Sequence, residues 1–190
     1  MNTNKHKNII ELLKQDYLLI NDGNLKQKVG EIVQEHIQRS LYNSTACITK
    51  QLKANYDHID GLIDYIIESL KKDFTSIPLS QCQGQLHAIA DNEYKRLVPF
   101  ANDFLVKAGL ASQSILGNFE QVINNKKEET KQAIEMKIAI IEKQKSSTAK
   151  KKLWYKKAWP YILGAIMLTA ALLAILWYAV DLKERFFPRK

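Results

Sequence analysis

An all-α fold is predicted for this 190-residue chain: a bundle of long antiparallel helices followed by a single C-terminal transmembrane helix. Three observations predict it. Apolar residues in the first 142 positions recur at helical spacing, strand-like alternation is nearly absent, and a charge-free apolar segment at 158–180 stands between basic flanks. The composition, with 46% apolar and 25% charged residues, is typical of a folded protein and argues against a disordered chain.

Two helices are predicted in the first forty residues, each from one apolar stripe. The turn-forming run Asn21-Asp22-Gly23 is expected to end the first helix, and Asn24 is expected to cap the second. The polar residues 42–45 are expected to bend or divide the chain after them. The first stripe is Ile9, Leu12, Leu13 and Tyr17, and the second is Leu25, Val29, Ile32, Val33 and His36.

A further amphipathic helix is predicted around 57–70, because apolar and acidic side chains segregate to opposite faces there. The stretch 75–80 is expected to be a loop, and the helix after it is expected to be kinked or broken at Pro99 and capped by Gly109. The apolar face of the helix at 57–70 is Ile59, Leu62, Ile63, Ile66, Ile67 and Leu70.

The last helix of the bundle is expected to begin near Ser112 or Ser114, which are suitable N-cap residues. The run 146–149 is interpreted as a flexible joint, and a helix that continues through it is the alternative. The predicted organisation has four parts: a cytoplasmic helical bundle at 1–142, a basic juxtamembrane segment at 143–157, a transmembrane helix at 158–180 and a short basic tail at 181–190.

The segment from Ala158 to Val180 has 23 residues and no charge. At about 1.5 Å per residue, a helix of this length reaches roughly 34 Å and can cross a hydrocarbon core of about 30 Å. A buried helix of a soluble protein is the alternative, and the basic flanks argue against it. Aromatic side chains at both ends are predicted to form interfacial belts: Trp159, Tyr161, Trp177 and Tyr178.

The net charge of +8 gathers around this segment. Residues 1–142 carry 17 basic and 18 acidic side chains, whereas residues 143–157 carry seven lysines and no acid, and residues 181–190 carry four bases and two acids. The excess on the N-terminal side predicts a cytoplasmic bundle and a tail on the far side of the membrane. No signal peptide is recognised and ten residues follow the span, so a single-pass, tail-anchored protein is expected.

The lysines and aromatic residues before the span are predicted to contact the headgroups of anionic lipids. Each base near such a surface contributes about 1 kcal/mol, and aromatic rings bury at the interface. A topology signal alone is the alternative, while the neutral bundle argues against nucleic-acid binding. The predicted contact residues are Lys150, Lys151, Lys152, Trp154, Tyr155, Lys156 and Lys157.

The sequence lacks the glycine-rich phosphate loops and paired-cysteine zinc spacings of common sites, so we predict a non-catalytic protein without a cofactor or a metal. His36 is interpreted as a core histidine satisfied by one hydrogen bond, and Cys47 and Cys82 as buried small residues. A group of acids beside His58 is interpreted as a solvated helix face rather than a metal site: Asp57, Asp60, Asp64 and Glu68.

Two functions fit these features. The favoured one is a membrane-anchored interaction or scaffold module whose bundle binds a cytoplasmic protein partner. The alternative is a self-assembling membrane effector, like a toxin or a defence protein, that perturbs the bilayer. Small residues four apart, at Ala165 and Thr169 and at Ala170 and Ala174, permit close helix approach and leave homo-oligomerisation open. The span has no polar stripe to line a pore, which favours the first function.

Overall fold

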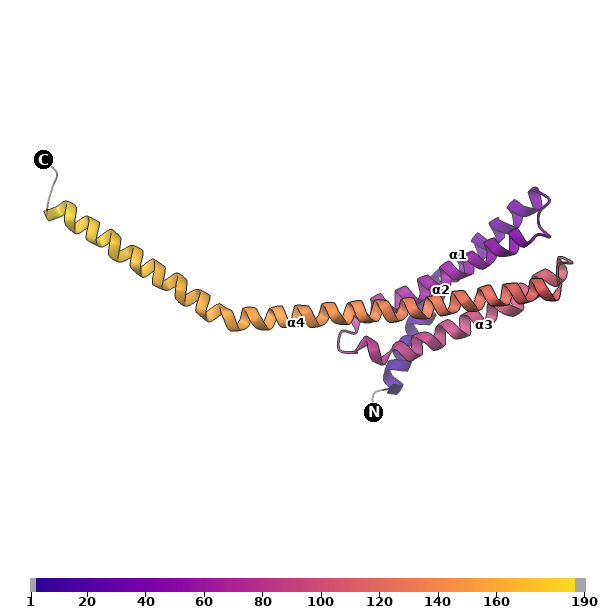
Figure 1. Ribbon diagram of the computed structural model, residues 1–190, viewed down its shortest axis with the longest axis horizontal. Helices are drawn as coiled ribbons and strands as arrows, with labels where there is room; N and C mark the ends of the chain where they lie inside the picture. Colours follow the sequence, from indigo (N-terminus) through magenta and orange to yellow (C-terminus); the bar gives the residue numbers. More distant parts are fainter. Residues whose placement is uncertain (1–2, 187–190) are drawn as a thin grey trace. The chain divides into compact units, whose positions relative to one another are not determined.

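The structure, a computed structural model, describes the backbone of residues 3–186 and the side chains of residues 6–148, 154–170 and 173. All regular structure in this part is helical: α1 (Thr3–Gln38), α2 (Thr45–Asp73), the short 3-10 helix η1 (Leu79–Gln81), α3 (Gln83–Lys107) and α4 (Gln113–Phe186) (Figure 1). The predicted all-helical fold is confirmed. The chain divides into a bundle unit, Met1–Glu142, and a C-terminal unit, Lys143–Lys190, which are described separately.

Helix α1 runs without interruption through Asn21 to Asn24, so the predicted turn and helix cap there are wrong. The Asn21 amide donates to the Tyr17 carbonyl at 3.0 Å, a bond within the helix, and the side chain therefore does not stop it. Tyr17 also holds α1 against α2, because its hydroxyl donates to the His58 carbonyl at 3.2 Å. A Cβ on Gly61 would lie 2.6 Å from that hydroxyl, so glycine permits the close approach. Packing thus overrides the local turn preference.

The polar residues 42–45 divide α1 from α2, as predicted, and both helix ends are capped. Ser44 precedes α2, and its hydroxyl accepts the Cys47 N–H at 3.3 Å. Helix α1 ends with Ser40 at φ 57°, where the Leu41 N–H donates to the His36 carbonyl at 2.7 Å. This is the left-handed helix end that usually takes glycine.

Gly109 ends α3 in the same way, as the sequence predicted. Its φ is 71°, and the Leu110 N–H donates to the Leu105 carbonyl at 2.8 Å. Pro99, in contrast, does not break α3, which continues to Lys107. Pro99 and Lys95 are both exposed, so water can reach the Lys95 carbonyl that loses its helical donor.

Helix α4 begins where predicted, because Ser112 accepts the Ile115 N–H at 3.3 Å and thereby caps it. The helix also continues through residues 146–148, so the alternative to a flexible joint is the one observed. The hydroxyls there donate to carbonyls three or four residues earlier, as Ser146 does to Lys143 at 2.8 Å.

The core of the bundle unit is built around α2. The predicted apolar face at 57–70 is buried, with every member at most 4% exposed, which confirms that prediction. Each such side chain contributes about 1.5–3 kcal/mol when fully buried. Helix α4 adds one stripe to this core: Ile123, Ile134, Ile138 and Ile141.

Consecutive helices of the bundle are antiparallel, while α2 and α4 are parallel neighbours. Asp60 and Asp64 of α2 contact Thr130 and Lys137 of α4, so residue numbers rise together along this pair. Helix α3 packs against both: the rings of Tyr56 and Tyr94 stack at 5.7 Å, and Tyr94 reaches Thr130 of α4. The α2–α4 pair therefore forms one continuous contact, and two pockets lie along it.

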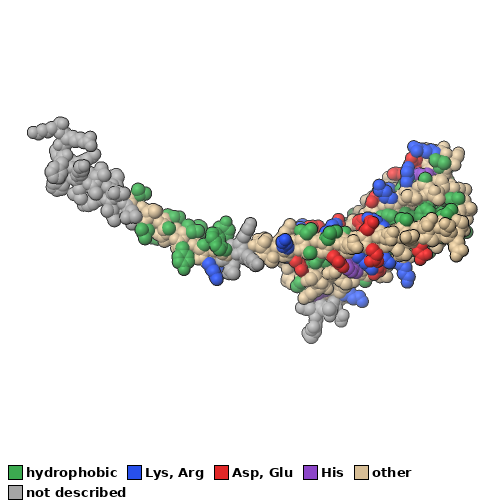
Figure 2. Space-filling model, viewed as in Figure 1, with side chains coloured by type: hydrophobic (Ala, Val, Ile, Leu, Met, Phe, Trp, Pro, Cys, Tyr) green, Lys and Arg blue, Asp and Glu red, His purple; other side chains and the backbone are tan. Residues whose placement is uncertain are grey.

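The described side chains of the C-terminal unit are almost all exposed. Figure 2 shows that hydrophobic side chains dominate the described part of this helix, whereas charged and apolar side chains alternate over the bundle unit. No helix within the described residues is long and apolar enough to cross a membrane. The predicted span at 158–180 falls partly outside the described side chains, at positions 171, 172 and 174–180.

Candidate functional site

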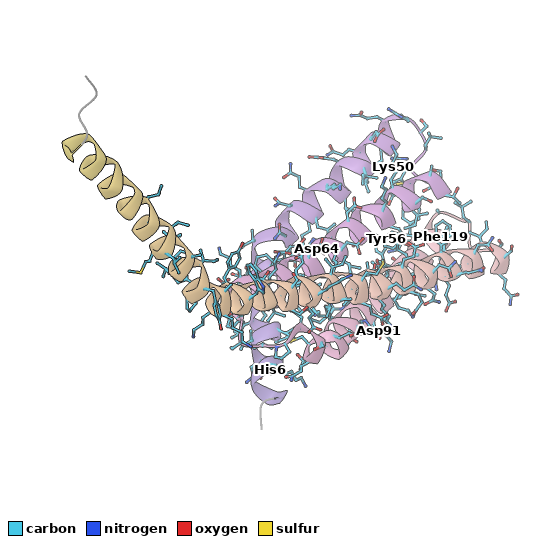
Figure 3. All side chains as sticks on the ribbon, turned by 60° about the vertical axis from the view of Figure 1, so that its left-hand side comes forward. His6, Lys50, Tyr56, Asp64, Asp91 and Phe119 are labelled. Atoms are coloured by element: carbon cyan, nitrogen blue, oxygen red, sulfur yellow. The ribbon has the colours of Figure 1, made fainter. Side chains whose placement is uncertain are left out.

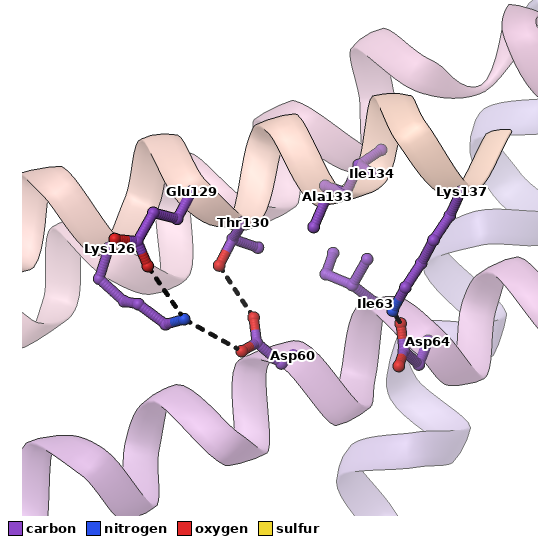
Figure 4. Close-up of a pocket in the computed structure, with 9 residues that line it drawn as sticks. All are labelled: Asp60, Ile63, Asp64, Lys126, Glu129, Thr130, Ala133, Ile134 and Lys137. Carbon is purple, nitrogen blue, oxygen red and sulfur yellow. Dashed lines mark hydrogen bonds and ion pairs between the residues drawn. The ribbon is translucent and has the colours of Figure 1, made fainter. Parts of the chain in front are cut away.

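A polar cleft of about 250 Å³ opens between α2 and α4 (Figure 4). Helix α2 supplies two carboxylates to the cleft, at Asp60 and Asp64, and α4 supplies two lysines, at Lys126 and Lys137. The other lining residues are Ile63, Glu129, Thr130, Ala133 and Ile134. The sequence placed the acids and the lysines on helices but did not predict that they meet.

A hydrogen-bond chain crosses the bundle beneath this cleft. Thr130 donates to the Asp60 carboxylate at 2.8 Å, and its hydroxyl oxygen lies 2.9 Å from the Tyr94 hydroxyl. Because Thr130 uses its proton on Asp60, Tyr94 must be the donor in the second bond. Tyr94 is 1% exposed, and burial raises its pKa far above the usual range. This chain joins α3, α4 and α2 through one buried contact, Tyr94 to Thr130, and one partly buried contact, Thr130 to Asp60.

Ion pairs close the rim of the cleft. The Lys126 ammonium lies 3.8 Å from Asp60 and 3.3 Å from Glu129, and Lys137 pairs with Asp64. On the other side of α2, Asp57 pairs with Lys28 of α1 at 3.3 Å. The acids remain open to solvent on this helix face, as interpreted, and the three aspartates in addition meet lysines of the neighbouring helices.

The charged groups of the cleft pair with one another. Their role in the structure is therefore to hold α2 against α4. Within the described residues, no group of three or more His, Cys, Asp or Glu side chains is placed to hold a metal ion. Asp60 already accepts from Thr130 and faces Lys126, so the cleft holds no unpaired carboxylate on this helix face.

The predicted core histidine and both predicted buried cysteines are confirmed. His36 is 3% exposed, and its Nδ1 lies 2.8 Å from the Ile32 carbonyl. Cys47 and Cys82 are free and fully buried, and burial raises the pKa of the Cys82 thiol.

His58, which the sequence analysis considered only beside the acidic group, lies in a different environment from those acids. It lies between α1 and α2, with its ring centroid 5.2 Å from that of Tyr17 and its Nε2 3.5 Å from Asp22. Burial lowers its pKa, although the charges of Asp22 and Glu93 act in the opposite direction. Protonation of His58 therefore opposes the packing of α1 on α2.

A second pocket, also about 250 Å³, lies farther toward the N-terminal ends of α2 and α4 and is almost wholly apolar. Tyr56 of α2 and Phe119 of α4 both line it, and Figure 3 shows these two residues near each other. Val122 stands at its rim with 53% of its surface exposed. A pocket of this kind depends on how two segments distant in the sequence meet, which no local pattern records.

The predicted membrane-contacting residues lie on exposed helix where they are described. Trp154 and Tyr155 are 62% and 60% exposed, with ring centroids 5.2 Å apart. Lys156, Lys157, Trp159 and Tyr161 are also exposed. The side chains of the remaining predicted contacts lie outside the described residues: Lys150, Lys151, Lys152, Trp177 and Tyr178.

Comparisons with protein families, with curated proteins and with solved structures found no match to this chain.

Proposed function

We propose that this protein is a non-catalytic, membrane-anchored interaction module, with the bundle unit in the cytoplasm and residues 158–180 as a single transmembrane helix. One observation carries the proposal. The apolar side chains described between Trp159 and Leu173 lie on all sides of one helix and are exposed on all sides. A helix that is apolar all round requires an apolar surrounding, and no described side chain of the chain supplies one.

The flanks of this segment support a bilayer as that surrounding. Basic residues stand on both sides of 158–180, with the larger excess before it, which favours a cytoplasmic bundle and a tail on the far side. The exposed rings of Trp154 and Tyr155 and the neighbouring lysines suit the headgroup region of anionic lipids. In this arrangement the segment 143–157 lies along the cytoplasmic surface.

The bundle unit then serves to hold a cytoplasmic protein partner near the membrane. Its described pockets offer recognition surfaces rather than a nucleophile beside a base. The effector alternative is less well supported, because the clearly polar side chain described within the span, Thr169, donates its hydroxyl to the Ile166 carbonyl at 2.8 Å. The Thr169 hydroxyl therefore bonds within its own helix and does not offer its proton to water in a pore.

Carbonate extraction of membranes tests the anchor. The full chain is expected to stay in the pellet, because about 20 apolar residues hold a helix in the bilayer without ionic contacts. A chain truncated after Lys145 is expected in the supernatant. Recovery of the full chain in the supernatant would contradict the proposal, and retention of the truncated chain would place the anchor elsewhere.

A further inference from the structure

We infer that the apolar pocket between α2 and α4 docks a protein partner through one bulky apolar side chain flanked by acidic residues. The inference rests on the proposed function, since it names the surface by which the interaction module holds its partner. The pocket lies wholly within the bundle unit and is lined by Thr49, Leu52, Tyr56, Asn118, Phe119 and Val122.

The size and lining of the pocket suit a single anchoring side chain. Its volume of about 250 Å³ is below the roughly 300–1,000 Å³ of typical small-molecule sites, and it accommodates one leucine or aromatic side chain. Leu52 and Phe119 form apolar walls, and Val122 leaves an apolar rim exposed to water. Such pockets at protein interfaces take the few anchors that dominate binding.

A polar group of the lining is also left without a partner. The Tyr56 hydroxyl is buried, and within the described part of the chain it has no hydrogen-bond partner. A buried hydroxyl without a partner is costly. The polar cleft on the same helix pair differs, because its charges already pair with one another.

The charge around the pocket favours an acidic partner. Lys53 lies four residues after Thr49 and three before Tyr56, on the same side of α2, and it is exposed. No ion pair of Lys53 is found among the described residues. Because α2 and α4 are parallel, both helix N-termini, at Thr45 and Gln113, lie toward this end of the pair.

The test uses the full chain in nanodiscs of phosphatidylcholine and two fluorescein-labelled helical peptides. Both peptides carry the same apolar stripe with one phenylalanine anchor, and their other positions are all glutamate or all lysine. Fluorescence anisotropy is expected to show at least tenfold tighter binding of the glutamate peptide. Val122→Asp is expected to weaken that binding at least tenfold, and Lys53→Glu to remove the preference between the peptides.

The control variant is Leu19→Asp, which changes an apolar side chain on α1 that is even more exposed than Val122. It is expected to leave both affinities within twofold. Both Leu19→Asp and Val122→Asp add one negative charge and leave the juxtamembrane lysines unchanged. A loss of binding in Val122→Asp alone therefore does not come from peptide binding to those lysines. Circular dichroism of all variants checks that the helices remain folded.

Equal binding of the two peptides, or binding unchanged by Val122→Asp, would overturn the inference. Displacement of a bound fluorescent anion by decanoate, with neither peptide bound, would also overturn it in favour of a small amphipathic ligand. A failure of the proposed function can be told apart from a failure of this inference. A chain that does not enter nanodiscs contradicts the membrane anchor, and peptide binding to the pocket is then measured on the chain in solution.

Discussion

The two parts of α4 treat their apolar residues differently. Between residues 113 and 142 the helix buries one stripe against α2 and α3, with Ile134 at 1% exposure. Between Trp159 and Leu173 the apolar side chains surround the helix and are exposed, as Met167 is at 71%. Both parts are helical and rich in isoleucine or leucine. The width of the apolar surface around the helix, rather than its hydrophobicity alone, distinguishes the part that packs on its neighbours from the part whose described apolar side chains stay uncovered.

Aspartate substitutions in the two parts are expected to give the largest contrast. Ile134→Asp buries an unpaired carboxylate in the core and is expected to cost several kcal/mol, enough to unfold the bundle unit. Ile166→Asp is expected to leave the bundle's melting temperature unchanged and to reduce membrane retention, since aspartate at a span centre costs about 2.5–3.5 kcal/mol. Thermal melts in detergent and carbonate extraction measure the two effects. Unfolding of the bundle by Ile166→Asp would contradict the expectation that the two parts of α4 contribute to different properties.

Removing one hydroxyl from each part sharpens the same contrast. Thr130→Val takes the partner from both Tyr94 and Asp60 and is expected to destabilise the bundle by about 1–3 kcal/mol. Thr169→Val removes a bond that the helix makes only with itself, so no loss of bundle stability is expected. Urea unfolding in detergent gives both values. A Thr130→Val variant as stable as the parent would show that the buried chain contributes nothing.

Acid is expected to weaken the bundle while leaving membrane retention unchanged. Burial lowers the folded-state pKa of His58 below its unfolded value near 6.5. Its contribution to stability is therefore complete above that pH and is lost as the pH falls through the folded pKa. His58→Gln is expected to reduce the slope of stability against pH below 6.5. The neighbouring carboxylates, Asp22 and Glu93, remain in the variant and serve as the internal control.

Much of the bundle was predictable because its signals are local. The two-faced pattern at 57–70, the polar division at 42–45, the serine cap before α4 and Gly109 after α3 each depend on a few adjacent residues. Predictions failed where the local structure or the partner of a side chain depends on a segment distant in the sequence. Tyr17 and Gly61 hold α1 straight through an apparent turn, and the lysines that meet Asp60 and Asp64 lie more than sixty residues away.

The candidate site was less predictable than the fold for the same reason. The apolar pocket depends on Leu52 and Phe119 coming from helices that are remote in the sequence. The candidate membrane anchor at 158–180 could be recognised from the sequence, because an uncharged apolar run with basic flanks is a local pattern. A sequence therefore indicates a candidate membrane anchor more readily than it indicates which cavity two helices leave between them.

A small gain in bundle stability is expected from Ser40→Gly. Ser40 adopts a left-handed conformation at the end of α1, which costs a residue with a Cβ roughly 1 kcal/mol relative to glycine. We expect the variant to be more stable by about 0.5–1 kcal/mol, with no effect on membrane retention. Gly109→Ala, at the equivalent position after α3, is the reverse control and is expected to destabilise by a similar amount.

Cysteine accessibility along α4 tests the membrane anchor most directly. Cys47 and Cys82 are replaced with alanine, and single cysteines are placed at successive positions from 143 to 182 in membranes opened to a charged maleimide. The account predicts labelling before residue 158 and after residue 180, with continuous protection between them. Labelling that recurs every three to four residues between 158 and 180 would mean that the helix lies on a surface with one face in water, and would contradict a transmembrane anchor.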